Sequence, residues 1–129
     1  MVKIKVDESK QRIYITISGV LSLLEARKAK ESIERAIQAL SPGFAVINDI
    51  SKLIRADEEG GVVLKEIILL LMKSGVRKII RVVGTSKTGL IQFANNSIPL
   101  DNYELSYVPS LEEAERLLSE SENNGQSAE

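Results

Sequence analysis

The spacing of apolar residues changes along the chain, and this change constrains the fold more than any other feature of the sequence. Residues 2–6 and 12–18 alternate between apolar and polar side chains, which is typical of half-buried strands. Residues 23–40 carry apolar side chains at helical spacing instead, and Ser22 precedes them as a candidate N-cap. The sequence therefore predicts a strand hairpin that ends at Gly19 and leads into a helix.

Strands and helices are expected to alternate over the rest of the chain. Further strands are predicted at 44–47, 76–83 and 103–108, and further helices at 57–73, 90–95 and from 110 onward, with a loop at 52–56. The order β-β-α-β-α-β-α-β-α favours an α/β fold, with a mixed central sheet, a parallel core and about four helices. In such a fold, the strands that contain Val46 and Ile79 are expected to be parallel neighbours.

The chain of 129 residues has the length of one domain. We expect this domain to span residues 1–120. Residues 121–129 are polar or small and offer nothing to bury, so we expect this segment to be disordered.

The composition excludes several kinds of function. Cysteine and histidine are absent, which excludes thiol catalysis, thiolate zinc sites and catalytic triads built on histidine. A net charge of -1 and an aromatic content of 4% disfavour nucleic-acid binding. The longest apolar run, residues 67–72, is far shorter than the roughly 20 residues that span a bilayer, and residues 1–6 do not resemble a signal peptide. We therefore expect a cytoplasmic protein that does not insert into membranes.

Acidic residues gather at the start of the predicted helix 57–73, where Asp57, Glu58 and Glu59 precede Gly60. Acidic side chains are common in a first helical turn because each complements the helix dipole by about 0.3–1 kcal/mol, and Asp57 suits the N-cap position. Alternatively, the three carboxylates form a fixed negative surface that a basic partner binds. The sequence leaves both interpretations open.

Two other groups of polar residues lie close to predicted strand ends. The segment 84–89 begins and ends with glycine, but Leu90 and Ile91 follow the second glycine where the Walker phosphate loop requires Lys and then Ser or Thr, so we expect an ordinary turn. Asp49 and Asp57 are carboxylates of the kind that bind Mg²⁺. Because the sequence offers no evident third ligand, we expect no metal and no other cofactor.

The apolar run 67–72 has three interpretations. It belongs to a helix packed on the sheet, it lines a pocket for a small molecule or lipid, or it forms the face of a homodimer. The tyrosines Tyr14, Tyr103 and Tyr107 fall on predicted strands and are interpreted as strand residues rather than catalytic acids.

The element order and three short motifs resemble the STAS or SpoIIAA-like family, which includes anti-sigma factor antagonists. The motifs are Gly-Val-Leu-Ser at 19–22, Asp-Glu-Glu-Gly at 57–60 and Ser-Leu-Glu-Glu-Ala at 110–114. The strand end Val-Val-Gly at 82–84 is also similar to that of a SpoIIAA-like group of small bacterial proteins. The resemblance covers roughly residues 1–120, and it implies a domain that binds a partner protein, such as a regulator or a kinase-like protein.

The chain departs from this family at one functional position. Phosphorylated members carry Ser or Thr at the start of the second helix, where this chain has Glu58 and Glu59, and residues 56–63 contain no hydroxyl side chain. The resemblance implies a second candidate region at the following loop, with Thr85, Ser86 and Thr88 as possible phosphorylation sites. We therefore expect a non-enzymatic interaction domain that binds its partner through residues 57–60 and this loop, and the alternative is a domain that binds a small molecule or lipid.

Overall fold

A five-stranded sheet forms the centre of the molecule. The computed structural model describes residues 1–84 and 104–127, with side chains to residue 120. The strands are β1 (Val2–Asp7), β2 (Arg12–Leu21), β3 (Ala45–Ala56), β4 (Lys78–Val82) and β5 (Glu104–Val108), and they lie side by side in that order. β1 is antiparallel to β2, whereas β2, β3, β4 and β5 are parallel, and Val46 pairs with Ile79. The predicted mixed sheet and the predicted parallel pair are confirmed.

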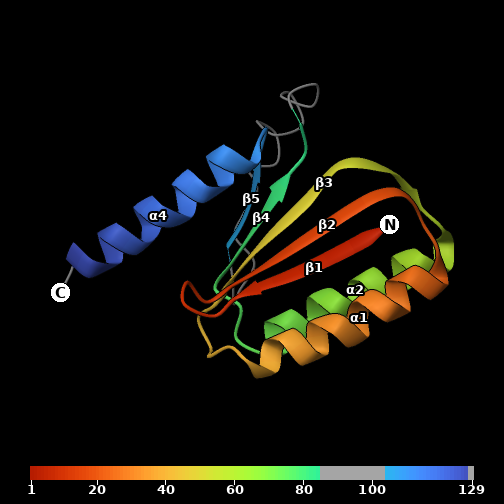
Figure 1. The fold of residues 1–129 in the computed structure, drawn as a ribbon, viewed down its shortest axis with the longest axis horizontal. Helices are drawn as coiled ribbons and strands as arrows, with labels where there is room; N and C mark the ends of the chain where they lie inside the picture. The colour runs from red at the N-terminus through yellow and green to blue at the C-terminus, as the bar shows by residue number, and fades with distance from the viewer. Residues whose placement is uncertain (85–103, 128–129) are drawn as a thin grey trace.

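Helices cover both faces of the sheet. The described residues contain three helices: α1 (Leu23–Gln38), α2 (Glu58–Lys73) and α4 (Leu111–Ser127). α1 and α2 lie side by side on one face, and α4 lies on the other (Figure 1). The helix expected at 90–95 falls outside the described residues. Within the described ranges, no helix is long and apolar enough to cross a membrane.

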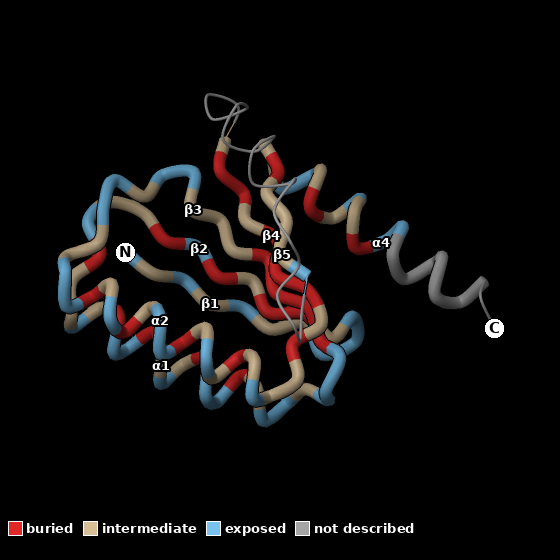
Figure 2. Tube along the Cα trace, turned by 180° about the vertical axis from the view of Figure 1, so that it is seen from behind, coloured by how far each residue is buried: buried red, intermediate tan, exposed pale blue. Residues whose placement is uncertain are grey.

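Two apolar cores lie between these layers, because successive residues of a strand face opposite sides of the sheet. Figure 2 places the buried residues along the middle strands and on the inner sides of the helices. The core under α1 and α2 contains Ile13, Ile15, Ile17, Leu21, Ala26, Ala29, Ile33, Ala36, Phe44, Val46, Val63, Ile67, Leu71, Val76 and Ile79. The smaller core under α4 contains Ala45, Ile47, Ile80, Val82, Val108, Ala114 and Leu118.

Two predicted boundaries in the sheet were wrong. β2 does not end at Gly19 but continues to Leu21, and β3 does not end at Ile47 but continues to Ala56, so the expected loop 52–56 is strand. The register between the two strands shifts on either side of Gly19, which has a positive φ of 72°. Glycine adopts this conformation without a Cβ clash, so it bends the strand instead of ending it.

A serine side chain caps two of the three described helices, as was predicted for Ser22. The Ser22 and Ser110 hydroxyls each accept a hydrogen bond from the backbone N–H three residues later. Asp57 occupies the N-cap position of α2, but its side chain makes no capping hydrogen bond. α4 continues to Ser127 and so includes most of the segment that we expected to be disordered. The predicted limit of the domain at residue 120 stays a prediction.

Candidate functional site

The acidic start of α2 is held against the end of β2. The backbone N–H of Asp57 donates to the Leu21 carbonyl at 2.9 Å, while the Asp57 carboxylate accepts from Arg55 Nη1 at 2.8 Å. Glu58 and Glu59 follow in the first turn and are exposed. The helix dipole favours negative charge at this place, and both carboxylates remain accessible to a partner.

Gly60 has a packing role within this predicted site. It is buried, and a Cβ at this position would lie 3.0 Å from the Leu21 carbonyl oxygen. The absence of a side chain lets α2 approach the junction between β2 and α1 closely. Gly60 therefore positions the acidic turn, whereas Asp57, Glu58 and Glu59 supply its surface. Thr85, Ser86 and Thr88, the other predicted contact residues, lie outside the described residues.

Segments that meet at this end of the molecule also carry exposed apolar side chains. Of the seven large apolar side chains exposed in the described part of the chain, five belong to this end: Met1, Val20, Leu24, Ile54 and Val62. Hydrogen bonds from the Met1 amino group to Ser18 and from Asp57 to Leu21 tie the chain start and α2 to the end of β2. Ile54 is 75% exposed. We call these five residues together with Asp57, Glu58 and Glu59 the α2-start surface.

The sequence alone did not reveal the apolar part of the α2-start surface. Val20 and Ile54 are apolar residues near strand ends, and the predicted loop at 52–56 gave Ile54 no defined place. In the structure, Val20 pairs with Arg55 where β2 and β3 extend past the bend at Gly19. A signal was present in the apolar residues Leu53 and Ile54, but the polar residues Ser51 and Lys52 before them favoured a loop.

A cavity lies between α2 and the sheet. Its volume is about 250 Å³, and apolar side chains from β2, β3, β4, α1 and α2 form most of its wall. The polar residues of the wall are Asn48, Lys65 and Arg81. Asn48 pairs with Arg81 in the sheet, and Arg81 pairs with Tyr107, so these three residues form one row across β3, β4 and β5. The sequence did not predict this row.

The two polar groups in the sheet wall differ in their partners. Arg81 Nη1 donates to the Tyr107 hydroxyl at 2.7 Å, and the guanidinium carbon lies 5.5 Å from the centre of the Tyr107 ring. Asn48 Oδ1 is buried, and it has no hydrogen-bond partner in the described part of the chain. Buried acceptors are nearly always satisfied in folded proteins, so this oxygen is exceptional.

The carboxylates of Asp49 and Asp57 each bond to a residue two positions away in the sequence. Asp49 Oδ1 accepts hydrogen bonds from the backbone and the hydroxyl of Ser51, and the Asp57 carboxylate is paired with Arg55. Among the residues that the structure describes, no three acidic side chains are grouped so that they could hold a metal ion.

Most of the apolar run 67–72 is covered within the chain. Ile67 and Leu71 are buried, Ile68, Leu70 and Met72 pack partly against the core, and Leu69 is 55% exposed. α1 covers a flank of α2 that the sequence left open to a second copy, as Figure 1 shows. The packed-helix and pocket interpretations therefore both have support in the structure, and the homodimer stays a prediction.

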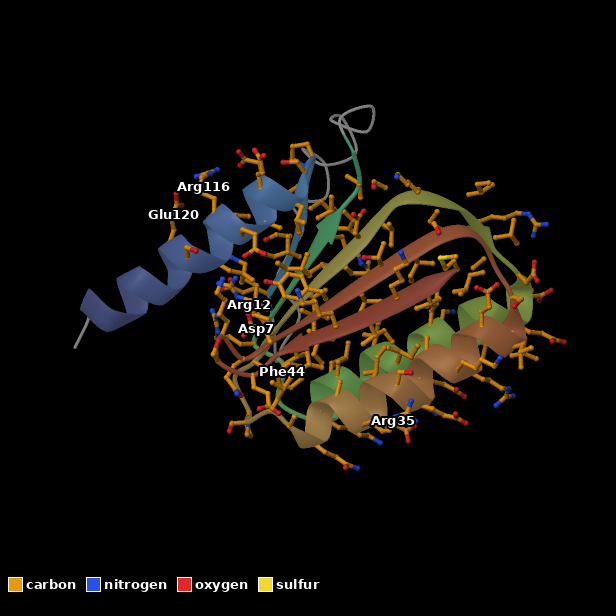
Figure 3. All side chains as sticks on the ribbon, viewed as in Figure 1. Asp7, Arg12, Arg35, Phe44, Arg116 and Glu120 are labelled. Carbon is orange, nitrogen blue, oxygen red and sulfur yellow. The ribbon has the colours of Figure 1, made fainter. Side chains whose placement is uncertain are left out.

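A polar network fixes α4 on the opposite face of the sheet. Arg12, labelled in Figure 3, is 2% exposed and donates from Nη1 to Glu115 Oε2 at 2.6 Å. The Tyr14 hydroxyl donates to Glu115 Oε1 at 2.8 Å. Burial raises the pKa of Tyr14 above its ordinary value, and the hydrogen bond to Glu115 acts in the same direction, whereas Arg12 opposes it. Tyr14 is therefore a neutral donor at physiological pH, in agreement with its interpretation as a strand residue.

Solved structures share this fold, although comparisons of sequence find no relatives. No family model and no curated protein matches the chain. An uncharacterized protein of the DUF3478 family from Shewanella loihica, described as having a SpoIIAA-like fold, matches with a TM-score of 0.69 and 15% identity over 92% of each chain. The unphosphorylated anti-sigma factor antagonist SpoIIAA matches with a TM-score of 0.59 and 15% identity, over 88% of this chain and 93% of that chain.

The phosphorylated form of SpoIIAA, a Bacillus cell fate determinant, gives a similar result. Its TM-score is 0.60 and its identity 15%, over 91% of this chain and 99% of that chain. The chain thus has a SpoIIAA-like fold, and the resemblance found in the sequence is confirmed at the level of the fold.

Proposed function

We propose that this chain is a non-enzymatic protein-binding domain and that the α2-start surface is its contact surface. The observation that supports the proposal is that five of the seven exposed large apolar side chains of the described residues lie on segments at the same end of the molecule as an accessible acidic turn. Protein interfaces commonly combine an apolar centre with a polar rim, and exposed apolar side chains that gather in one place mark such surfaces. The absence of histidine and cysteine from the sequence also favours binding over catalysis.

The chemistry of the surface defines the kind of partner. Glu58 and Glu59 favour a partner that presents Lys or Arg, next to apolar side chains that cover Ile54 and Val62. By analogy with the matched anti-sigma factor antagonist, the partner is a regulator or a kinase-like protein, and the complex forms in the cytoplasm.

The negative charge of the surface is permanent in this proposal. SpoIIAA is known in an unphosphorylated and a phosphorylated form, but residues 56–63 of this chain contain no Ser or Thr to accept a phosphate. Each glutamate carries one charge, whereas phosphoserine carries about 1.5 to 2 charges and three acceptor oxygens, so the imitation of a phosphate is partial. A partner that prefers the charged form binds this chain without a kinase.

Binding measurements with two matched sets of variants test the proposal. The partner is first retrieved with the tagged full chain from the native host and then purified for calorimetry. We expect Glu58→Ser with Glu59→Ser to weaken binding about tenfold and to reduce its salt dependence, because both carboxylates face the partner. Ile54→Ser is expected to cost a similar factor through lost apolar contact.

The control places the same chemical change on another helix. Glu31 and Glu34 are exposed on α1, and Glu31→Ser with Glu34→Ser should leave the affinity unchanged. Equal affinity for the wild type and the Glu58/Glu59 variant would contradict the proposal and would show that these carboxylates only stabilise the start of the helix. Phosphorylation at Thr85, Ser86 or Thr88 by the host's kinase would contradict the claim that the domain is not switched.

A further inference from the structure

We propose that the cavity beneath α2 binds a small aliphatic carboxylate that carries a hydroxyl group close to its carboxylate, such as a medium-chain 3-hydroxy fatty acid. Arg81 binds the carboxylate, Asn48 accepts a hydrogen bond from the hydroxyl, and the alkyl chain lies against the apolar wall. This activity goes beyond the proposed protein binding and uses residues outside the α2-start surface.

The size of the cavity limits the ligand. Its volume of about 250 Å³ exceeds the roughly 150 Å³ of an engineered cavity that holds benzene, and it lies just below the roughly 300 Å³ at which sites for drug-sized molecules begin. One alkyl chain of medium length fits this space, whereas a phospholipid with two acyl chains does not. The ligand is therefore a free amphiphile rather than a bilayer lipid.

The apolar part of the wall comes from both layers of the fold. Ile17, Val46 and Ile79 contribute from the sheet, and Ile33, Leu64 and Ile68 contribute from the helices. An alkyl chain in this space loses its contact with water on both sides, which is the main favourable term for such a ligand.

The charge of the wall selects an anion. Arg81 and Lys65 are cationic, and the wall contains no aspartate or glutamate among the residues that the structure describes. Arg81 donates a hydrogen bond to the hydroxyl of Tyr107, and no ion pair between Arg81 and a carboxylate is found in the part of the chain that the structure describes. A guanidinium beside an apolar cavity is a strong site for a carboxylate, because the weakly polar surroundings strengthen the attraction.

Asn48 accounts for the hydroxyl group of the proposed ligand. Its Oδ1 atom is buried without a hydrogen-bond partner in the described residues, so a ligand hydroxyl would satisfy it. Asn48 and Arg81 are register partners on neighbouring parallel strands, which lie about 4.8 Å apart. A carboxylate and a hydroxyl on nearby carbons of one chain can reach two side chains at this spacing. A simple fatty acid would leave Asn48 Oδ1 unsatisfied.

Calorimetry with three probes of equal chain length tests each part of the proposal. The probes are 3-hydroxydecanoate, decanoate and decanol, each titrated into the full chain below its aggregation concentration. We expect 3-hydroxydecanoate to bind most tightly, decanoate about tenfold more weakly and decanol more weakly again, because each step removes one polar contact. Absence of binding by all three probes would overturn the proposal, and so would equal affinities.

Variants assign each preference to one side chain. Arg81→Gln should abolish the preference for decanoate over decanol, and Arg81→Lys should restore it in part. Asn48→Leu should abolish the preference for 3-hydroxydecanoate over decanoate while leaving decanoate bound. Arg55→Gln is the control, because Arg55 is an exposed arginine that pairs with Asp57 outside the cavity wall. Retention of both preferences in the Arg81 and Asn48 variants would overturn the assignment.

Two further measurements distinguish binding in the cavity from unfolding of a variant and from attachment to a membrane. Circular dichroism of each variant establishes that lost binding does not reflect lost folding. Sedimentation with phosphatidylglycerol vesicles tests whether the protein binds an anionic lipid at a membrane surface instead. Binding to vesicles without binding of free 3-hydroxydecanoate would overturn the proposal in favour of a membrane surface.

Discussion

At the scale of single residues, Glu115 joins α4 to the sheet through two hydrogen bonds. It accepts one from Arg12 and one from Tyr14, and both donors lie on β2. We expect Glu115→Ala to lower the free energy of unfolding by about 1–3 kcal/mol, because two buried or half-buried donors lose a charged acceptor. Denaturant unfolding followed by circular dichroism measures the change.

The neighbouring acidic residues of α4 provide the control for Glu115. Glu112 is exposed in the first turn of the same helix, and Glu112→Ala should change the free energy of unfolding by no more than about 0.5 kcal/mol. Arg116 and Glu120, also labelled in Figure 3, form an exposed ion pair one turn apart, and such pairs contribute little. Equal losses for Glu112→Ala and Glu115→Ala would show that the buried network does not hold α4.

At the scale of elements, adjacent glycines in α2 allow a direct test of how closely this helix packs. A Cβ on Gly60 would lie 3.0 Å from the Leu21 carbonyl oxygen, whereas a Cβ on Gly61 would meet nothing within 4 Å. Gly61→Ala should therefore stabilise the fold by about 0.5–1 kcal/mol through helix propensity. Gly60→Ala should forfeit this gain and destabilise the fold by about 1 kcal/mol, because backbone atoms must move.

Thermal unfolding of both glycine variants distinguishes packing from propensity. A higher midpoint for Gly61→Ala and a lower one for Gly60→Ala support the close approach of α2 to the junction of β2 and α1. Equal stabilisation by the two substitutions would contradict this close approach. Gly60 would then have no packing role and would remain only a predicted contact residue.

The elements that could be predicted are those whose pattern is local. The hairpin, the three described helices and the parallel pairing at Val46 and Ile79 follow from hydrophobic period and capping residues. The extension of β3 to Ala56 could not be predicted in this way, because its residues after Ile50 are mostly exposed and their polar and apolar side chains do not alternate. That part of β3 is strand because β2 continues beside it, which is a long-range cause.

In the candidate site, too, only the residues that are consecutive in the sequence could be predicted. The acidic turn at 57–59 is visible in the sequence because its residues are consecutive. The cavity row of Asn48, Arg81 and Tyr107 comes from three strands, and only the register of the sheet brings these residues together. The apolar run of α2 predicted a pocket as one alternative, but it did not predict the polar residues of the cavity wall.

At the scale of the whole molecule, the two faces of the sheet are covered unequally. Two helices and the larger core stabilise one face, while α4 alone covers the other, over a smaller core. The apolar residues that α4 contributes to this core, Ala114 and Leu118 with Leu117 beside them, all precede residue 121. The docking of α4 therefore depends on its first half.

Truncation tests whether the domain ends near residue 120. Residues 121–129 contain Ala128 as their only apolar side chain, so their removal buries or exposes little apolar surface. We expect a chain that ends at Glu120 to unfold within about 0.5 kcal/mol of the full chain in denaturant. A chain that ends at Pro109 is the control, and it should lose several kcal/mol because Val82 and Val108 lose their cover. A large loss on truncation after Glu120 would instead place the end of the domain within the last turns of α4.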